Sequence, residues 1–160
     1  MRWFRFAALL ILATLLQASF FADLNSKPDL LLILLVFFAI YCNTSDAIIT
    51  SFTIGFAADL IGRTMGPQML SFGLFGTLLA YLHQVIAIRK MTYQSLAIFT
   101  TALLAGTLVY FLNLIKGVSS PPNICAALFG ISLYSALVGP FLFLPSAWWM
   151  RIKINRLKPR

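Results

Sequence analysis

Six long apolar runs separated by short polar turns dominate the sequence and restrict the folds open to it. The runs cover residues 3–22, 29–41, 46–61, 68–87, 93–115 and 123–150. Apart from the second and third, each reaches the ~20 apolar residues that a helix needs to cross a bilayer. A helix also satisfies its own backbone N–H and C=O groups, which lipid cannot do. We therefore predict an all-α integral membrane protein, folded as a single polytopic domain over residues 1–160.

The composition agrees with a membrane location and argues against nucleic-acid binding. Of the 160 residues, 61% are hydrophobic and 10% are charged, whereas soluble domains are about 25% charged. The net charge is +8, but the basic residues gather at the chain ends and in short turns. This distribution favours contact with lipid headgroups and control of topology over nucleic-acid recognition. We expect membrane lipids among the partners.

The second and third runs are short for membrane spans. As a helix, residues 29–41 would be about 20 Å long at ~1.5 Å per residue, against a hydrocarbon core of ~30 Å. The two runs either span with local thinning of the bilayer or form a re-entrant hairpin buried among the other helices. We favour spanning. The later turns are assigned to the same sides of the membrane whether the two runs span or form a hairpin.

The distribution of Lys and Arg predicts the orientation. With six spans and the N-terminus inside, nine basic residues lie on the inner side and three on the outer side. The inner set is Arg2, Arg5, Arg89, Lys90, Arg151, Lys153, Arg156, Lys158 and Arg160, and the outer set is Lys27, Arg63 and Lys116. Because cytoplasmic loops carry the excess of positive charge, both termini should be cytoplasmic. The first run is too long for the apolar part of a typical signal peptide, so we interpret it as a retained helix.

Polar residues in the outer turns are the candidates for a site. Asp59 and Arg63 are four residues apart, so they share a helix face in the favourable order, acid before base. The simpler interpretation is that they neutralise each other where the helix ends. Asp29 begins the second run, where a negative charge suits a helix N-terminus. In the functional alternative, Asp29, Asp59 and Arg63 lie at one depth and form a small polar cluster.

Small residues mark candidate faces for helix packing. Gly73, Gly76, Thr77 and Ala80 recur at helical spacing in the fourth run, and Gly106 lies in the fifth. Such a stripe lets a neighbouring helix approach closely.

Catalysis has little support in this sequence. It has one His and four acidic residues, all of them Asp near the ends of runs. No phosphate-binding, zinc-protease or nucleophile-elbow motif is present. Cys42 and Cys125 should lie at opposite membrane faces, so we expect no disulfide. We predict no enzymatic activity, no cofactor and no metal.

The order of these features resembles the rod shape-determining protein MreD family. Pro28-Asp29 opens the second run, a Gly-x-x-x-Asp pattern runs from Gly55 to Asp59, and a Gly66-Pro67 turn follows. The resemblance covers almost the whole chain and is most specific over residues 28–81. It implies a non-enzymatic inner-membrane subunit of the bacterial elongation machinery, with a bundle similar to the substrate-binding component of energy-coupling-factor (ECF) transporters. Arg63 departs from the family pattern, where a small or polar residue is common.

Two functions remain open at this point. The first is a scaffold that binds MreC, near the actin-like filament and the peptidoglycan polymerase–transpeptidase pair, with a second copy of itself as a further partner. The alternative is the vitamin-binding component of an ECF-type transporter, which would need a polar outer cavity. The candidates for that cavity are Asn25, Asp29, Asp59, Arg63 and Asn123. A lipid-handling enzyme would need acidic or metal-binding residues that the sequence lacks.

Overall fold

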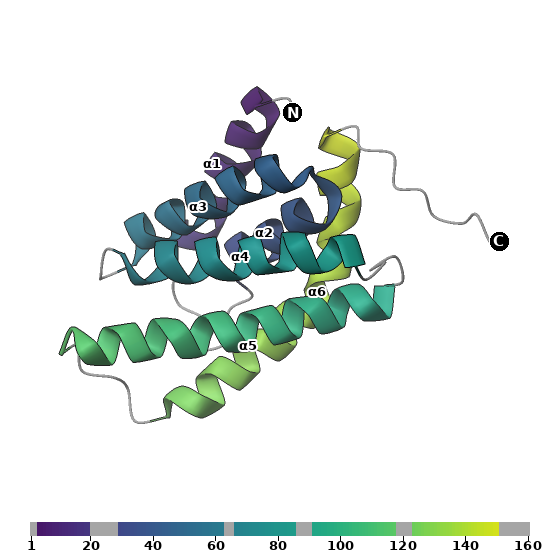
Figure 1. Cartoon of the computed structure of the whole chain (residues 1–160). Coiled ribbons are helices and arrows are strands. Elements are labelled where there is room, and N and C mark those ends of the chain that lie inside the picture. The colour runs from purple at the N-terminus through teal and green to yellow at the C-terminus, as the bar shows by residue number, and fades with distance from the viewer. Residues whose placement is uncertain (1–2, 20–28, 63–65, 86–90, 118–122, 151–160) are drawn as a thin grey trace.

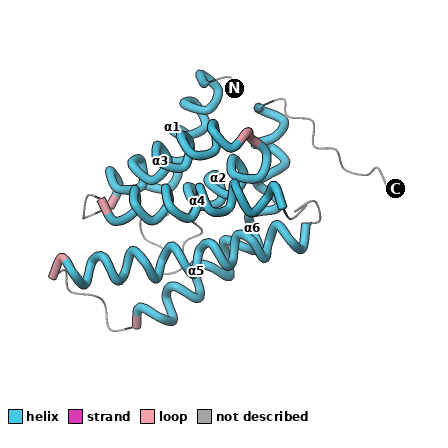
Figure 2. Tube along the Cα trace, in the orientation of Figure 1, coloured by secondary structure: helices cyan, strands magenta, loops and turns pink. Residues whose placement is uncertain are grey.

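Six helices make up the computed structural model, which describes residues 3–19, 29–62, 66–85, 91–117 and 123–150 (Figure 1). The helices are α1 (Trp3–Ser19), α2 (Leu30–Tyr41), α3 (Thr44–Ile61), α4 (Pro67–Val85), α5 (Met91–Ile115) and α6 (Ile124–Met150). All regular structure within these ranges is α-helix (Figure 2). The expectation of an all-helical protein is therefore confirmed.

Three of the described helices contain stretches that are long and apolar enough to cross a membrane. These stretches are Thr44–Ile61 in α3, Thr92–Ile115 in α5 and Ile124–Phe143 in α6. The helices α1 and α2 are also apolar but shorter. Large exposed hydrophobic side chains are spread over all helices except α2, which is the pattern of a bundle whose outer surface faces lipid.

The second helix, α2, is the centre of the bundle. Every residue from Leu31 to Ile40 is buried, and α2 packs against each of the other five helices. A helix that is apolar on all sides requires cover on all sides. Its short length therefore fits a central position, in which the other helices surround it.

Aromatic rings fix α2 against α1 and α6. Phe38 meets Phe6 of α1 edge to face with ring centres 5.0 Å apart, and Phe37 meets Phe143 of α6 at 5.4 Å. At the end of α2 the Tyr41 hydroxyl accepts a hydrogen bond of 2.9 Å from the Gln94 amide of α5. These contacts place the core along α2. The most extensive contact between two helices is a different one, between α3 and α4.

Candidate functional site

The helices α3 and α4 meet backbone to backbone at Gly55. A Cβ atom added at Gly55 would lie 2.7 Å from the Cα atom of Met69 and 3.0 Å from the carbonyl oxygen of Gln68. Both neighbours are main-chain atoms in the first turn of α4, so they cannot move aside as a side chain would. Only glycine allows the start of α4 to lie this close to α3.

Asp59 lies one helical turn after Gly55 and turns its carboxylate toward the start of α4. The residue is 3% exposed. Its Oδ2 atom accepts hydrogen bonds from the N–H groups of Gly66 and Met69, each at 2.9 Å, and Oδ1 accepts from the N–H of Gln68 at 3.0 Å. A side chain of α3 therefore caps the N-terminus of α4.

This arrangement accounts for every N–H group at the start of α4. Pro67 is the first helical residue and has no N–H, which makes this the helix position that best tolerates proline. Gly66, Gln68 and Met69 donate to Asp59, and Leu70 donates to the Gly66 carbonyl at 3.1 Å. No donor in this first turn lacks a partner, which matters because an orphaned buried N–H costs about 1–3 kcal/mol.

The turn before α4 also depends on its glycine. Gly66 has φ 109°, a left-handed conformation that side chains disfavour. The carboxylate at a helix N-terminus adds a favourable interaction with the helix dipole. We call the unit formed by Gly55, Asp59, Gly66 and Pro67 the hairpin clamp.

Asp29 forms a second, separate capping site. It is the N-cap of α2, where Oδ1 accepts from the Leu32 N–H and from the Gln17 Nε2, both at 3.1 Å. The side-chain Oε1 of Gln17 accepts from the Leu31 N–H at 3.2 Å, and the Asp29 N–H donates to the Ser135 hydroxyl at 2.9 Å. One polar site therefore connects α1, α2 and α6.

The predicted outer cluster thus becomes two capping sites that serve two different helices. Asp29 caps α2, and Asp59 caps α4. Pro28 and Arg63 lie outside the described residues, so the predicted Asp59–Arg63 pair stays a prediction. Sequence reasoning missed Gln17 and Ser135, although a polar side chain inside an apolar run is itself a signal of an interhelical hydrogen bond.

The small-residue stripe of α4 faces α3 of the same chain. A Cβ added at Gly73 would collide with the ring of Phe52, and one added at Gly76 would collide with the side chain of Ser51. Thr77 donates its hydroxyl to the Gly73 carbonyl at 2.6 Å, and Ala80 is buried.

Gly106 has the same role between α5 and α6. A Cβ added there would lie 2.6 Å from Cδ2 of Leu128. The small-residue faces of α4 and α5 are therefore covered by α3 and α6 of the same chain. A partner helix would have to use another surface.

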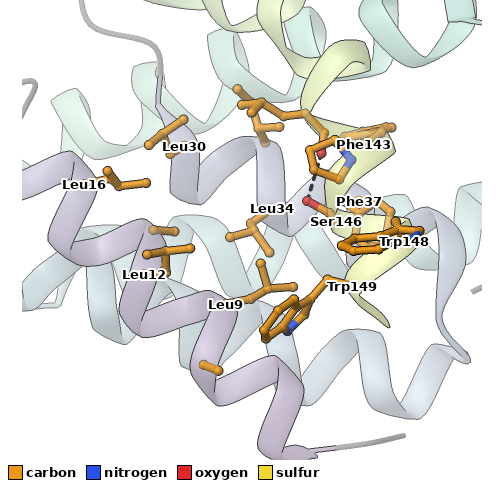
Figure 3. A pocket seen from close by; sticks show the side chains of 15 residues that line it. Leu9, Leu12, Leu16, Leu30, Leu34, Phe37, Phe143, Ser146, Trp148 and Trp149 are labelled. Atoms are coloured by element: carbon orange, nitrogen blue, oxygen red, sulfur yellow. Dashed lines mark hydrogen bonds between the residues drawn. The ribbon is translucent and has the colours of Figure 1, made fainter. Parts of the chain in front are cut away.

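An apolar groove lies between α1 and α6, with α2 as its floor (Figure 3). Its volume is about 300 Å³. The described lining residues are Ala8, Leu9, Leu12, Ala13, Leu16, Leu30, Ile33, Leu34, Phe37, Leu142, Phe143, Pro145, Ser146, Trp148 and Trp149. Nothing in the sequence alone predicted this groove, because it depends on how α1 and α6 diverge.

The side chains of Asp29 and Asp59 are used in helix capping. Among the described residues, no group of three or more His, Cys, Asp and Glu side chains could hold a metal ion. Cys42 and Cys125 are free thiols. Burial, together with the nearby charge of Asp46, raises the pKa of Cys42 to about 11, which makes it a poor nucleophile at neutral pH.

The fold and its capping sites define a polytopic helical membrane protein whose described acidic anchors, Asp29 and Asp59, are used to hold helices together. A family model described as rod shape-determining protein MreD matches residues 1–152. The chain belongs to the MreD family. A search of the curated proteins and a search of the solved structures each found no significant match.

Proposed function

We propose that the chain is a membrane scaffold of the bacterial elongation machinery, which binds MreC and organises peptidoglycan synthesis to maintain rod cell shape. The observation that carries this proposal is the family match over residues 1–152. The helical membrane fold supports it, because the carboxylates of Asp29 and Asp59 cap helices and so hold the bundle together. Further partners in this proposal are the polymerase–transpeptidase pair, the actin-like filament and a second copy of the chain.

The proposed location is the inner membrane, with both termini in the cytoplasm. Nine basic residues on one side against three on the other support this orientation. Reporter fusions at the two termini test it directly. Reporters that respond on different faces of the membrane would contradict the proposed topology.

We also propose that the bundle shares its architecture with the substrate-binding components of ECF transporters. No observation favours the transport function itself. The described groove is lined by aliphatic and aromatic side chains, whereas a vitamin site needs a few placed polar groups. A thermal-shift screen with vitamins checks this point, and saturable stabilisation by one vitamin would favour transport.

Co-purification with MreC after detergent extraction tests the scaffold function. At native expression we expect a stable complex, and its repeated absence would contradict the proposal. Gly76→Leu, which drives a side chain into Ser51 of α3, should lower the amount of folded protein and of complex and should widen the cells. Leu78→Ala changes an exposed residue of the same helix and should leave all three readouts unchanged.

A further inference from the structure

The groove between α1 and α6 has the lining of a hydrocarbon site. Apart from the two indole rings, Ser146 is the one described lining residue with a polar side chain. Its hydroxyl donates to the Leu142 carbonyl at 2.8 Å within its own helix. The groove therefore offers its occupant apolar contact along the walls and no group that would recognise a polar molecule there.

The dimensions of the groove match one membrane leaflet. Along α1 the lining runs from Ala8 to Leu16, which is about 12 Å at ~1.5 Å per residue. Half of the ~30 Å hydrocarbon core is about 15 Å. Figure 3 shows Leu16 at one end, Leu12 and Leu9 along the wall, and Trp149 beside Leu9. The length of the groove is therefore close to the thickness of one leaflet.

The groove is small for a ligand site. Its volume of about 300 Å³ lies at the lower end of the range for ligand pockets, about 300–1,000 Å³. A single extended hydrocarbon chain is an occupant that suits a space of this size with an apolar lining.

A positively charged side chain, Arg5, lies at the end of the groove that carries Trp149. Arg5 donates from Nη1 to the Trp149 carbonyl at 3.2 Å, which places its guanidinium at this end. Trp148 is 82% exposed, and Trp side chains favour the boundary between lipid and water. Positive charge at this depth complements an anionic headgroup.

We propose that the α1–α6 groove binds one acyl chain of an anionic phospholipid, with the headgroup beside Arg5 and Trp149. The assignment to the inner leaflet rests on the proposed orientation. The binding itself needs only the membrane location, and it does not depend on MreC.

The three tryptophans of the chain provide the readout. Trp148 and Trp149 line the groove, and Trp3 meets the ring of Phe6 edge to face at the start of α1. The full-length protein is reconstituted in phosphatidylcholine vesicles with a small fraction of lipid carrying brominated acyl chains. We expect brominated phosphatidylglycerol to quench the tryptophan fluorescence more strongly than brominated phosphatidylcholine at the same fraction. Equal quenching by the two lipids would overturn the proposal, and this comparison requires no variant.

Matched variants assign the quenching to the groove. Ala8→Phe places a ring in the groove and should abolish the preference for phosphatidylglycerol, whereas Ala126→Phe makes the same change on an exposed part of α6 and should retain it. Arg5→Gln should reduce the preference about five-fold, the factor expected for one basic residue near an anionic lipid. A preference that survives Ala8→Phe would contradict the proposed site.

Discussion

Two pairs of helices, α3–α4 and α1–α6, pack in opposite ways. α3 and α4 touch main chain to main chain at Gly55, and Asp59 of one helix supplies the cap of the other. α1 and α6 share the hydrogen bond from Arg5 to Trp149 and leave an open apolar groove. Helices in a membrane gain little from the hydrophobic effect between them, so close association requires small residues and shared hydrogen bonds. Where large side chains replace these features, a gap remains for another hydrocarbon group.

The largest effect in this comparison should come from Asp59→Ala. The change leaves the partly buried N–H groups of Gly66, Gln68 and Met69 without an acceptor, at about 1 kcal/mol or more each. We expect a loss of at least about 3 kcal/mol in the free energy of unfolding, measured by reversible denaturation in mixed micelles. Asp59→Asn keeps one acceptor oxygen and should lose less. A loss below about 1 kcal/mol for Asp59→Ala would mean that the clamp contributes little.

Gly55→Ala and Gly106→Ala form a matched pair with opposite expectations. Both changes gain up to ~1 kcal/mol in helix propensity. At Gly55 the new methyl group meets the main chain of α4, so we expect a net loss of about 1–3 kcal/mol. At Gly106 it meets the end of the Leu128 side chain, which can rotate away. Gly106→Ala should therefore be neutral or stabilising, and equal losses at both positions would contradict the distinction.

Asp29→Ala should cost less than Asp59→Ala, about 1 kcal/mol. Its carboxylate caps one N–H of α2, that of Leu32, and Gln17 still accepts from Leu31. The measurement is the same unfolding experiment, with Ser135→Ala as a partner variant that removes the bond to α6. If Asp29→Ala proved more damaging than Asp59→Ala, the ranking of the two capping sites would be wrong.

The two cysteines should differ in reactivity without a change in stability. The pKa of Cys42 is raised to about 11 by burial and by Asp46, so its thiol stays protonated at neutral pH. In a Cys125→Ser variant, maleimide labelling should be slow at pH 7 and accelerate as the pH rises toward 11. In a Cys42→Ser variant the exposed Cys125 should label readily at pH 7. Rapid labelling of Cys42 at pH 7 would show that its surroundings are open to water.

The sequence predicted the helices well because each depends on local properties. Apolar runs and polar turns placed α1 to α6 in the regions where the structure has them. The all-round apolar character of residues 30–41 also agrees with the buried position of α2. The stripe at Gly73 and Gly76 indicated a packing face, but its neighbour, α3, became clear only from the fold.

The role of Asp59 was harder to predict because spacing alone favoured Arg63 as its partner. A signal was present in the turn that follows. Gly66 precedes α4 and Pro67 begins it, so the cap position lacks the Ser, Thr, Asp or Asn that usually caps a helix. A helix that begins in this way must obtain its acceptor from elsewhere, and the nearest carboxylate in the sequence is Asp59. The groove had no comparable signal, because it results from the relative direction of α1 and α6.

Amide hydrogen exchange at Gln68 and Met69 tests the clamp most directly. First-turn amides of a helix normally exchange fast because they have no partner inside the helix. If Asp59 holds them, they should exchange at least about 100-fold more slowly than Cys125 and Ala126 in the first turn of α6, and Asp59→Ala should remove the difference. Exchange at Gln68 and Met69 as fast as at Cys125 and Ala126 in the unaltered protein would contradict the clamp.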